Sequence, residues 1–320
     1  MNITTQKARA AVFGAAIGDA VGVPYEFKSR IEMRAHPATD MVGRGTYSQP
    51  AGTWSDDTSM ILCTLDTLDD TVNYDAVMKA FLHWKEQGAY TPYGECFDIG
   101  TTTWTALHNY KRGCEPLHCG GESERSNGNG SLMRILPAAL YADAKGLSFD
   151  DAMTLAHYLS RLTHAHRRSL VGCGLFTGVA LALLANPSKD AVAQGIAAAC
   201  THYRTRCDAR MQHELAEHYA RVTDERFFAL PEEEIRSVGY VVATLECALW
   251  CLMNTDSYRD CVLKAVNFGD DTDTAACVAG ALAGLLYGWE GIPEAWRRQL
   301  ARPEKIDSVL AGFCQRCGIQ

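Results

Sequence analysis

Apolar stretches with helical spacing alternate along the chain with polar stretches rich in glycine, asparagine and charged residues. Residues 7–22 are alanine-rich and repeat their apolar positions at helical intervals, which predicts a helix. Gly14, Gly18 and Gly22 recur every four residues and therefore share one face of that helix. We expect a second helix to pack closely against this glycine face.

The same spacing predicts further helices, and no stretch alternates with the period of two that is typical of a β-strand. The predicted helices are 7–22, 54–68, 75–85, 101–110, 149–162, 169–184, 189–201, 238–253 and one that follows Asp273. Irregular structure is predicted for 29–52, 90–100 and 114–130, and 204–234 is a more charged region. Because no repeat or linker divides the chain, we expect one all-α domain over residues 1–320.

An acidic turn precedes the most uniformly apolar of these helices. Gly269-Asp270-Asp271-Thr272-Asp273-Thr274 leads into residues 275–286, which contain almost no polar side chain. A helix that is apolar all round is buried, so its N-terminus should point into the interior or into a cleft. Asp and Thr are common helix caps, whereas converging carboxylates bind a hard cation such as magnesium or manganese. Taken alone, this turn fits both interpretations.

A second turn of the same kind, Ser55-Asp56-Asp57-Thr58, opens the helix predicted at 54–68. Two such turns, more than two hundred residues apart, are harder to explain as caps than one. Their oxygens suit two magnesium-class ions bridged by a carboxylate, and Asp19 and Glu26 are spare acids that could join them. Few histidines lie near either turn, which disfavours zinc.

Composition narrows the class of protein. The 320 residues are 47% hydrophobic and carry a formal charge of −8, which argues against nucleic acid or an anionic membrane as the main partner. We see no signal-peptide pattern at the start, and the longest apolar run, 170–185, is short and glycine-rich for a membrane span. Thirteen scattered cysteines suit a reducing compartment, and only Cys314 and Cys317 have the spacing of a metal or redox pair. We expect a cytoplasmic protein with no membrane partner.

Several motifs follow one another in an order that resembles the ADP-ribosylglycohydrolase family. They are Gly18-Asp19-Ala20 with Glu26, Trp54-Ser55-Asp56-Asp57-Thr58, Asp98-Ile99-Gly100-Thr101-Thr102, Asn129-Gly130-Ser131-Leu132-Met133-Arg134, Thr163-His164 and Asp271-Thr272-Asp273-Thr274. The resemblance covers about residues 10–290, with an extension to 320. It implies an all-helical single domain with a binuclear magnesium or manganese centre. It also implies hydrolysis of the bond that joins ADP-ribose to a protein side chain, most often arginine.

The resemblance implies a role for individual residues. The implied metal ligands are Ser55, Asp56, Asp57, Asp271, Asp273 and Thr274. The implied substrate contacts are Asp98, Gly100, Thr101, Asn129, Gly130, Ser131, Met133 and His164, and the implied catalytic groups are Asp98, Asp57 and Glu26. The chain departs from the family in having Ser55 where Thr is commoner and Asp270 where Gly is commoner.

Each of these residues also has an ordinary structural interpretation. Asn129-Gly130-Ser131 fits a simple turn and cap, and His164 fits a hydrogen-bonded residue at a helix end. Asp98 could cap the helix that starts near Thr101. Arg134, one turn into an apolar helix, is more often a salt-bridge partner than a substrate clamp.

The resemblance leaves three functions open. The first is a metal-dependent hydrolase that releases ADP-ribose from a modified protein, with Asp98 or a metal-ligating acid accepting the proton. The second is a binding protein that shields its partner without turnover, for example an immunity protein against an ADP-ribosyltransferase toxin. The third is a hydrolase of a small ADP-ribosyl compound. The presence of every expected ligand favours the enzyme.

Overall fold

The computed structural model describes residues 4–319, and within them the chain is helical, with isolated β-bridges but no strand. This confirms the predicted all-α class. The α-helices are α1 (Thr5–Gly22), α2 (Arg30–Ala35), α3 (Asp56–Thr67), α4 (Tyr74–Gln87), α5 (Thr101–Lys111), α6 (Leu136–Ala144), α7 (Phe149–Arg161), α8 (Arg167–Ala185), α9 (Lys189–Arg206), α10 (Ala209–His218), α11 (Val241–Met253), α12 (Tyr258–Val266), α13 (Thr272–Gly291), α14 (Glu294–Gln299) and α15 (Pro303–Cys317). Short 3-10 helices lie at η1 (Val23–Tyr25), η2 (Gly45–Tyr47), η3 (Pro116–His118), η4 (Glu124–Ser126), η5 (Glu225–Ala229) and η6 (Glu232–Glu234).

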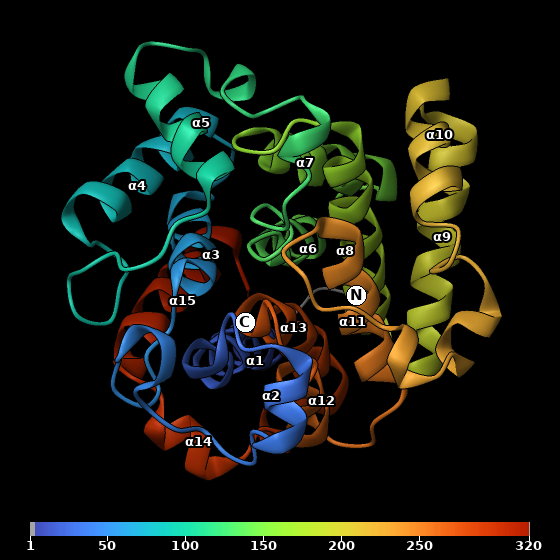
Figure 1. Ribbon diagram of the computed structural model, residues 1–320. Coiled ribbons are helices and arrows are strands. Elements are labelled where there is room, and N and C mark those ends of the chain that lie inside the picture. The colour runs from blue at the N-terminus through green and yellow to red at the C-terminus, as the bar shows by residue number, and fades with distance from the viewer. Residues whose placement is uncertain (1–3, 320) are drawn as a thin grey trace.

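Helices α1 and α13 form the centre of the molecule and run antiparallel, side by side (Figure 1). A β-carbon on Gly14 would lie 2.4 Å from the carbonyl oxygen of Gly280, and one on Gly18 would lie 2.0 Å from that of Ala276. At the end of α1, a β-carbon on Gly22 would lie 2.3 Å from the α-carbon of Asp273. The expected close packing on the glycine face is confirmed. It brings the C-terminal end of α1 against the N-terminal end of α13.

The other helices surround this pair. In Figure 1, α3, α4 and α5 lie on one side of the central pair and α8, α9 and α10 on the other, while α12 packs against α13. Helix α8 is the one described helix that is long and apolar enough to cross a membrane, but 83% of its apolar window is buried inside the protein. It therefore serves as a core helix that α6, α7 and α9 cover.

One prediction of irregular structure was wrong in part, and the charged region for which no element was predicted contains a helix. The stretch 29–52 contains α2, because Ser29 and Glu32 form a reciprocal capping box that satisfies the first N–H groups of a short helix. The charged region 204–234 contains α10, which Asp208 caps and which buries Met211 and Leu215 on an otherwise polar surface. A single thin apolar stripe within many charges hides such a helix from inspection of the sequence.

Candidate functional site

The two acidic turns meet at the centre of the protein, as the N-termini of α3 and α13. Asp56 and Asp57 occupy the first turn of α3, and Asp273 and Thr274 the first turn of α13. The hydroxyl of Thr274 donates to Asp57 Oδ1 at 3.3 Å, which joins the turns directly. Four of the implied ligands are thus brought together by helices that start more than two hundred residues apart.

Asp19 anchors the first turn and is not a spare acid. Its carboxylate accepts hydrogen bonds from the backbone N–H groups of Ser55 (3.0 Å) and Thr58 (3.1 Å), and from the Thr58 hydroxyl at 2.6 Å. Complete burial raises the pKa of Asp19 to about 6, although these hydrogen bonds lower it. Asp19 therefore caps α3 from the neighbouring α1, and Ser55 adds a weaker cap through its own hydroxyl.

The capping interpretation fails for Asp271. This residue stands at the N-cap position of α13, yet its side chain makes no capping hydrogen bond. Its Oδ1 is buried without a hydrogen-bond partner, and its Oδ2 accepts from the amide of Asn129 at 2.9 Å. The carboxylate is held toward the other acids rather than toward its own helix.

The acid cluster has the properties of a cation site. One carboxylate oxygen each of Glu26, Asp271 and Asp273 lie within 4.8 Å of one another. Glu26 Oε2 and Asp57 Oδ2 are buried without a hydrogen-bond partner, as is Asp271 Oδ1. Burying unpaired carboxylates is costly, and a divalent cation removes that cost. All donors are oxygens, so the residues present fit magnesium or manganese.

The pKa values of these acids reflect their burial and the closeness of the carboxylates to one another. Burial, followed by the charge of Asp98, raises the pKa of Asp56 well above its usual range. Burial also raises the pKa of Asp57 and of Asp273 well above it, with neighbouring carboxylates adding to the effect. For Glu26, burial and then the charge of Asp98 raise the pKa to about 8. A bound cation would reverse these shifts, because opposite charge favours the ionised form.

Asp98 lies beside the cluster, and Tyr47 lies near both. The Tyr47 hydroxyl partly offsets the rise in the pKa of Glu26 and of Asp98. Burial, followed by the charge of Asp271, raises the pKa of Asp98. The N-cap of α5 is Gly100, which has no side-chain cap, so Asp98 does not cap that helix. Sequence analysis missed Tyr47, because it stands in the polar stretch 29–52 with no motif around it.

The loop 127–131 borders the other side of the cluster. Besides Asp271, the amide of Asn129 donates to the Thr244 hydroxyl at 2.9 Å. Ser131 is fully buried, and its hydroxyl accepts from Ser160 at 2.9 Å, so its side chain faces the core. Met133 is buried as well. The implied substrate contacts of Ser131 and Met133 would therefore have to come from the backbone.

The glycines of this loop lie against His164. A β-carbon on Gly130 would lie 2.9 Å from His164 Cε1, and one on Gly128 would lie 3.7 Å from Nε2. Glycine thus lets the backbone approach the imidazole closely. Gly100 and Thr101 lie exposed at the start of α5.

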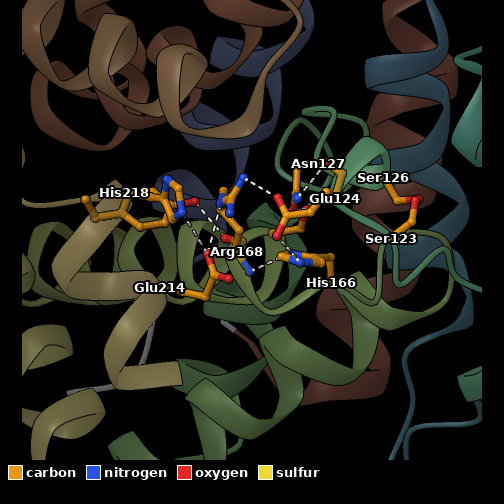
Figure 2. Close-up of polar contacts among 10 residues, drawn as sticks. Ser123, Glu124, Ser126, Asn127, His166, Arg168, Glu214 and His218 are labelled. Atoms are coloured by element: carbon orange, nitrogen blue, oxygen red, sulfur yellow. Dashed lines mark hydrogen bonds and ion pairs between the residues drawn. The ribbon is translucent and has the colours of Figure 1, made fainter. Parts of the chain in front are cut away.

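An ion-pair network supports the loop from outside (Figure 2). Arg168 Nη1 lies 3.0 Å from Glu124 Oε2, and its Nε donates to Glu214 Oε2 at 2.9 Å. The amide of Asn127 donates to the Glu124 carbonyl, and Ser169 donates to Asn127 Oδ1. Glu124, His166 and Glu214 also lie close enough to hold a metal, but the guanidinium of Arg168 already neutralises both carboxylates. We interpret this network as a structural brace.

Asp270 shows why the family commonly has glycine at this position. Its φ is +57°, in the left-handed region that favours glycine. Asp270 is exposed, and its backbone pairs with residues 27 and 28 through two hydrogen bonds of 2.7 Å. Its extra charge faces solvent.

Comparison with known proteins agrees with this site. The family model described as ADP-ribosylglycohydrolase matches residues 1–318 of this chain. An ADP-ribosylarginine hydrolase Tri1 of Serratia proteamaculans is 32% identical over 95% of this chain and 77% of its own length, and one of Pseudomonas putida is 35% identical over 97% and 78%. The ADP-ribosyl-[dinitrogen reductase] glycohydrolase of Rhodospirillum rubrum is 28% identical over 95% of this chain and 96% of its own.

A solved structure has the same fold. The chain described as an ADP-ribosylglycohydrolase-related protein complex superposes with a TM-score of 0.79 and 27% identity, covering 98% of both chains. The family is metal-dependent, in agreement with the buried acid cluster. The match over nearly the whole chain, together with the two acidic turns at the N-termini of α3 and α13, shows that this protein belongs to the ADP-ribosylglycohydrolase family.

Proposed function

We propose that this glycohydrolase removes ADP-ribose from modified arginine side chains of proteins. The observation that carries the proposal is the convergence of buried carboxylates from α3, α13 and Glu26 in one place. The similarity to two ADP-ribosylarginine hydrolases over most of the chain supports arginine as the modified residue.

The cofactor that fits is a pair of magnesium or manganese ions. Ser55, Asp56, Asp57, Asp271, Asp273 and Thr274 would hold them, with Glu26 at the edge. When bound, such ions would orient the ribose hydroxyls and favour deprotonation of the attacking water. Asp19 would ligate neither ion, because its oxygens already hold the first turn of α3.

The chain's own groups provide the rest of the chemistry. Cleavage at the anomeric carbon gives the sugar oxocarbenium character, which the surrounding carboxylates stabilise. Asp98 accepts the proton of the attacking water as the bond to the side-chain nitrogen breaks, and Asp57 or Glu26 are the alternatives for this role. The loop from Asn129 to Ser131, with His164, would receive the diphosphate on backbone N–H groups.

The test compares ADP-ribose release from arginine-modified and serine-modified proteins, side by side with added magnesium or manganese. Release from the arginine-modified protein alone would support the proposal, and preferential release from the serine-modified one would overturn its specificity. Tight ADP-ribose binding without hydrolysis of either substrate would favour a shielding protein, with an ADP-ribosyltransferase toxin as the natural partner to assay. We further propose that residues 1–320 act as one cytoplasmic domain.

A further inference from the structure

Arg134 is a buried cation without a carboxylate partner. Its side chain is 0% exposed, and no ion pair involves it within the described residues. Two of its nitrogens, Nε and Nη1, have no hydrogen-bond partner. The salt-bridge interpretation of this residue was therefore wrong. The ring of Phe81, whose centroid lies 4.8 Å from Arg134 Cζ, offsets part of the cost of burying this charge. Because two nitrogens still lack a partner, we expect the guanidinium to have a specific use.

The one guanidinium nitrogen that is engaged leads to His164. Arg134 Nη2 donates to the Thr163 hydroxyl at 2.7 Å and to the Leu159 carbonyl at 3.1 Å. The Thr163 oxygen in turn lies 2.8 Å from His164 Nδ1. A buried chain of hydrogen bonds thus runs from Arg134 through Thr163 to the imidazole.

The chemistry of these groups decides where the imidazole proton lies. Arginine can only donate, so the Thr163 oxygen accepts from Arg134. The Thr163 proton then has one acceptor among its contacts, His164 Nδ1. A proton on Nδ1 would leave the buried Thr163 O–H without an acceptor, which costs about 1–3 kcal/mol. The proton of a neutral His164 therefore lies on Nε2.

His164 is neutral in the folded protein. Burial, and then the nearby charge of Arg134, lower the pKa of its imidazole to about 3. Within the described residues Nε2 makes no hydrogen bond, although His164 is only 2% exposed. Its edge faces Gly128 and Gly130. The hydroxyl of Thr103, a residue of α5 that is only 1% exposed, reaches the same loop: it would lie 3.2 Å from a β-carbon on Gly130, and it has no hydrogen-bond partner.

We propose that Arg134 and Thr163 are positioning residues that hold His164 as the Nε2–H tautomer, so that the ring donates to a diphosphate lying on the loop 128–130. The inference rests on the proposed function, which places ADP-ribose in this site. The unpartnered hydroxyl of Thr103 is a second donor to the same anion, and Arg134, which has no carboxylate partner, adds positive charge beneath the loop. An anion is the ligand that such an arrangement favours.

The test uses Thr163→Val, which removes the relay hydroxyl at nearly unchanged shape, and Thr163→Ser, which keeps it. With full-length protein and bound metal, Thr163→Val should weaken ADP-ribose binding and raise KM about tenfold, the loss expected for a hydrogen bond to a charged group. Its kcat at saturating substrate should stay within about twofold. Thr163→Ser should resemble the wild type, and neither change should alter the affinity for adenosine, which lacks the diphosphate.

Nitrogen-15 NMR of the imidazole resonances provides a readout that a purely structural role would not move. His164 is assigned by the signals that disappear in His164→Gln. In the wild type and Thr163→Ser, the proton should be on Nε2, and in Thr163→Val the two tautomers should mix. A proton on Nδ1 in the wild type, or unchanged ADP-ribose affinity in a folded Thr163→Val, would overturn the inference. If the protein is not specific for modified arginine, only the assay of ADP-ribose release from modified proteins will show it. The ADP-ribose affinities and the tautomer of His164 would still be as expected here.

Discussion

At the scale of single residues, aspartates from three different motifs have different surroundings, and we expect them to perform different tasks. The two carboxylate oxygens of Asp19 accept hydrogen bonds from backbone N–H groups at the start of α3, and Asp19 thereby positions the site. Asp57 keeps Oδ2 free of any hydrogen bond, as a ligand requires. Asp98 lies near Tyr47 at the edge of the cluster, a position that suits the proton acceptor we propose. The surroundings of each carboxylate, rather than the residue type, distinguish the anchor from the proposed ligand and the proposed base.

Asp98→Asn tests the last of these roles. Asparagine has nearly the same shape but cannot accept the proton, so single-turnover hydrolysis should fall by about 10²–10⁴-fold while calorimetry still shows ADP-ribose binding. Asp273→Ala is the matched comparison and should lose both turnover and tight binding. Hydrolysis by Asp98→Asn at the wild-type rate would show that the base is another acid, such as Asp57 or Glu26.

His164 predicts a pH dependence of stability. Its pKa of about 3 in the folded protein lies below the value of 6.5 for an ordinary histidine. Above pH 6.5 both states are neutral, and as the pH falls toward 3 the unfolded state alone takes up the proton, so the folded state loses stability. At pH 5 the loss should reach roughly 2 kcal/mol. Urea unfolding between pH 7.5 and pH 5 should show a shallower decline in His164→Gln, and parallel declines would contradict this pKa.

At the scale of elements, the contact between α1 and α13 places the acids. Glycines on both helices bring the backbones together: a β-carbon on Gly280 would lie 2.3 Å from the Gly14 carbonyl oxygen, and one on Gly284 would lie 2.2 Å from that of Ala10. Asp19 and Glu26 stand at the end of α1 that this contact fixes beside Asp273. Any change in helix separation therefore alters the distances between the carboxylates.

Gly18→Ala should separate the two helices. The added methyl group would meet the Ala276 carbonyl at 2.0 Å, a backbone atom that cannot move alone. We expect a loss of about 1–3 kcal/mol or more in urea unfolding, together with weaker magnesium binding by calorimetry. Gly312→Ala on α15 is the control, since its methyl group meets the side chain of Arg316 and not the backbone of a neighbouring helix. That change should alter stability by at most about 1 kcal/mol and leave magnesium affinity unchanged; equal effects of both substitutions on magnesium affinity would contradict the account.

At the scale of the whole molecule, folding brings together mutually repelling charges at the meeting point of α1, α3 and α13. The chain tolerates this because apolar helices on all sides bury large areas and offset the local cost. Relief of that repulsion by a cation links the stability of the entire protein to metal binding.

Removing the metal should lower the melting temperature and abolish hydrolysis together. A cation that binds only the folded state adds about 2.7 kcal/mol at a hundredfold excess over its Kd. Magnesium or manganese should restore both properties after chelation, and zinc should not restore activity. Full activity in the presence of a chelator would refute a metal site in the acid cluster. A melting temperature that does not change as the magnesium concentration rises from zero to well above millimolar would refute it as well.

The sequence by itself determined the all-α class, the close packing at Gly14, Gly18 and Gly22, and the pairing of two acidic turns. These features depend on local periodicity and on residue types whose chemistry does not need the fold. Only the tertiary structure decided which carboxylate oxygens lack a hydrogen bond, because their partners are distant in the chain: Ser55 for Asp19 and Asn129 for Asp271. It likewise decided that Arg134 has no acid beside it and instead reaches His164 through Thr163, because spacing along a chain specifies neighbours on one helix but not the side chains that meet across the core.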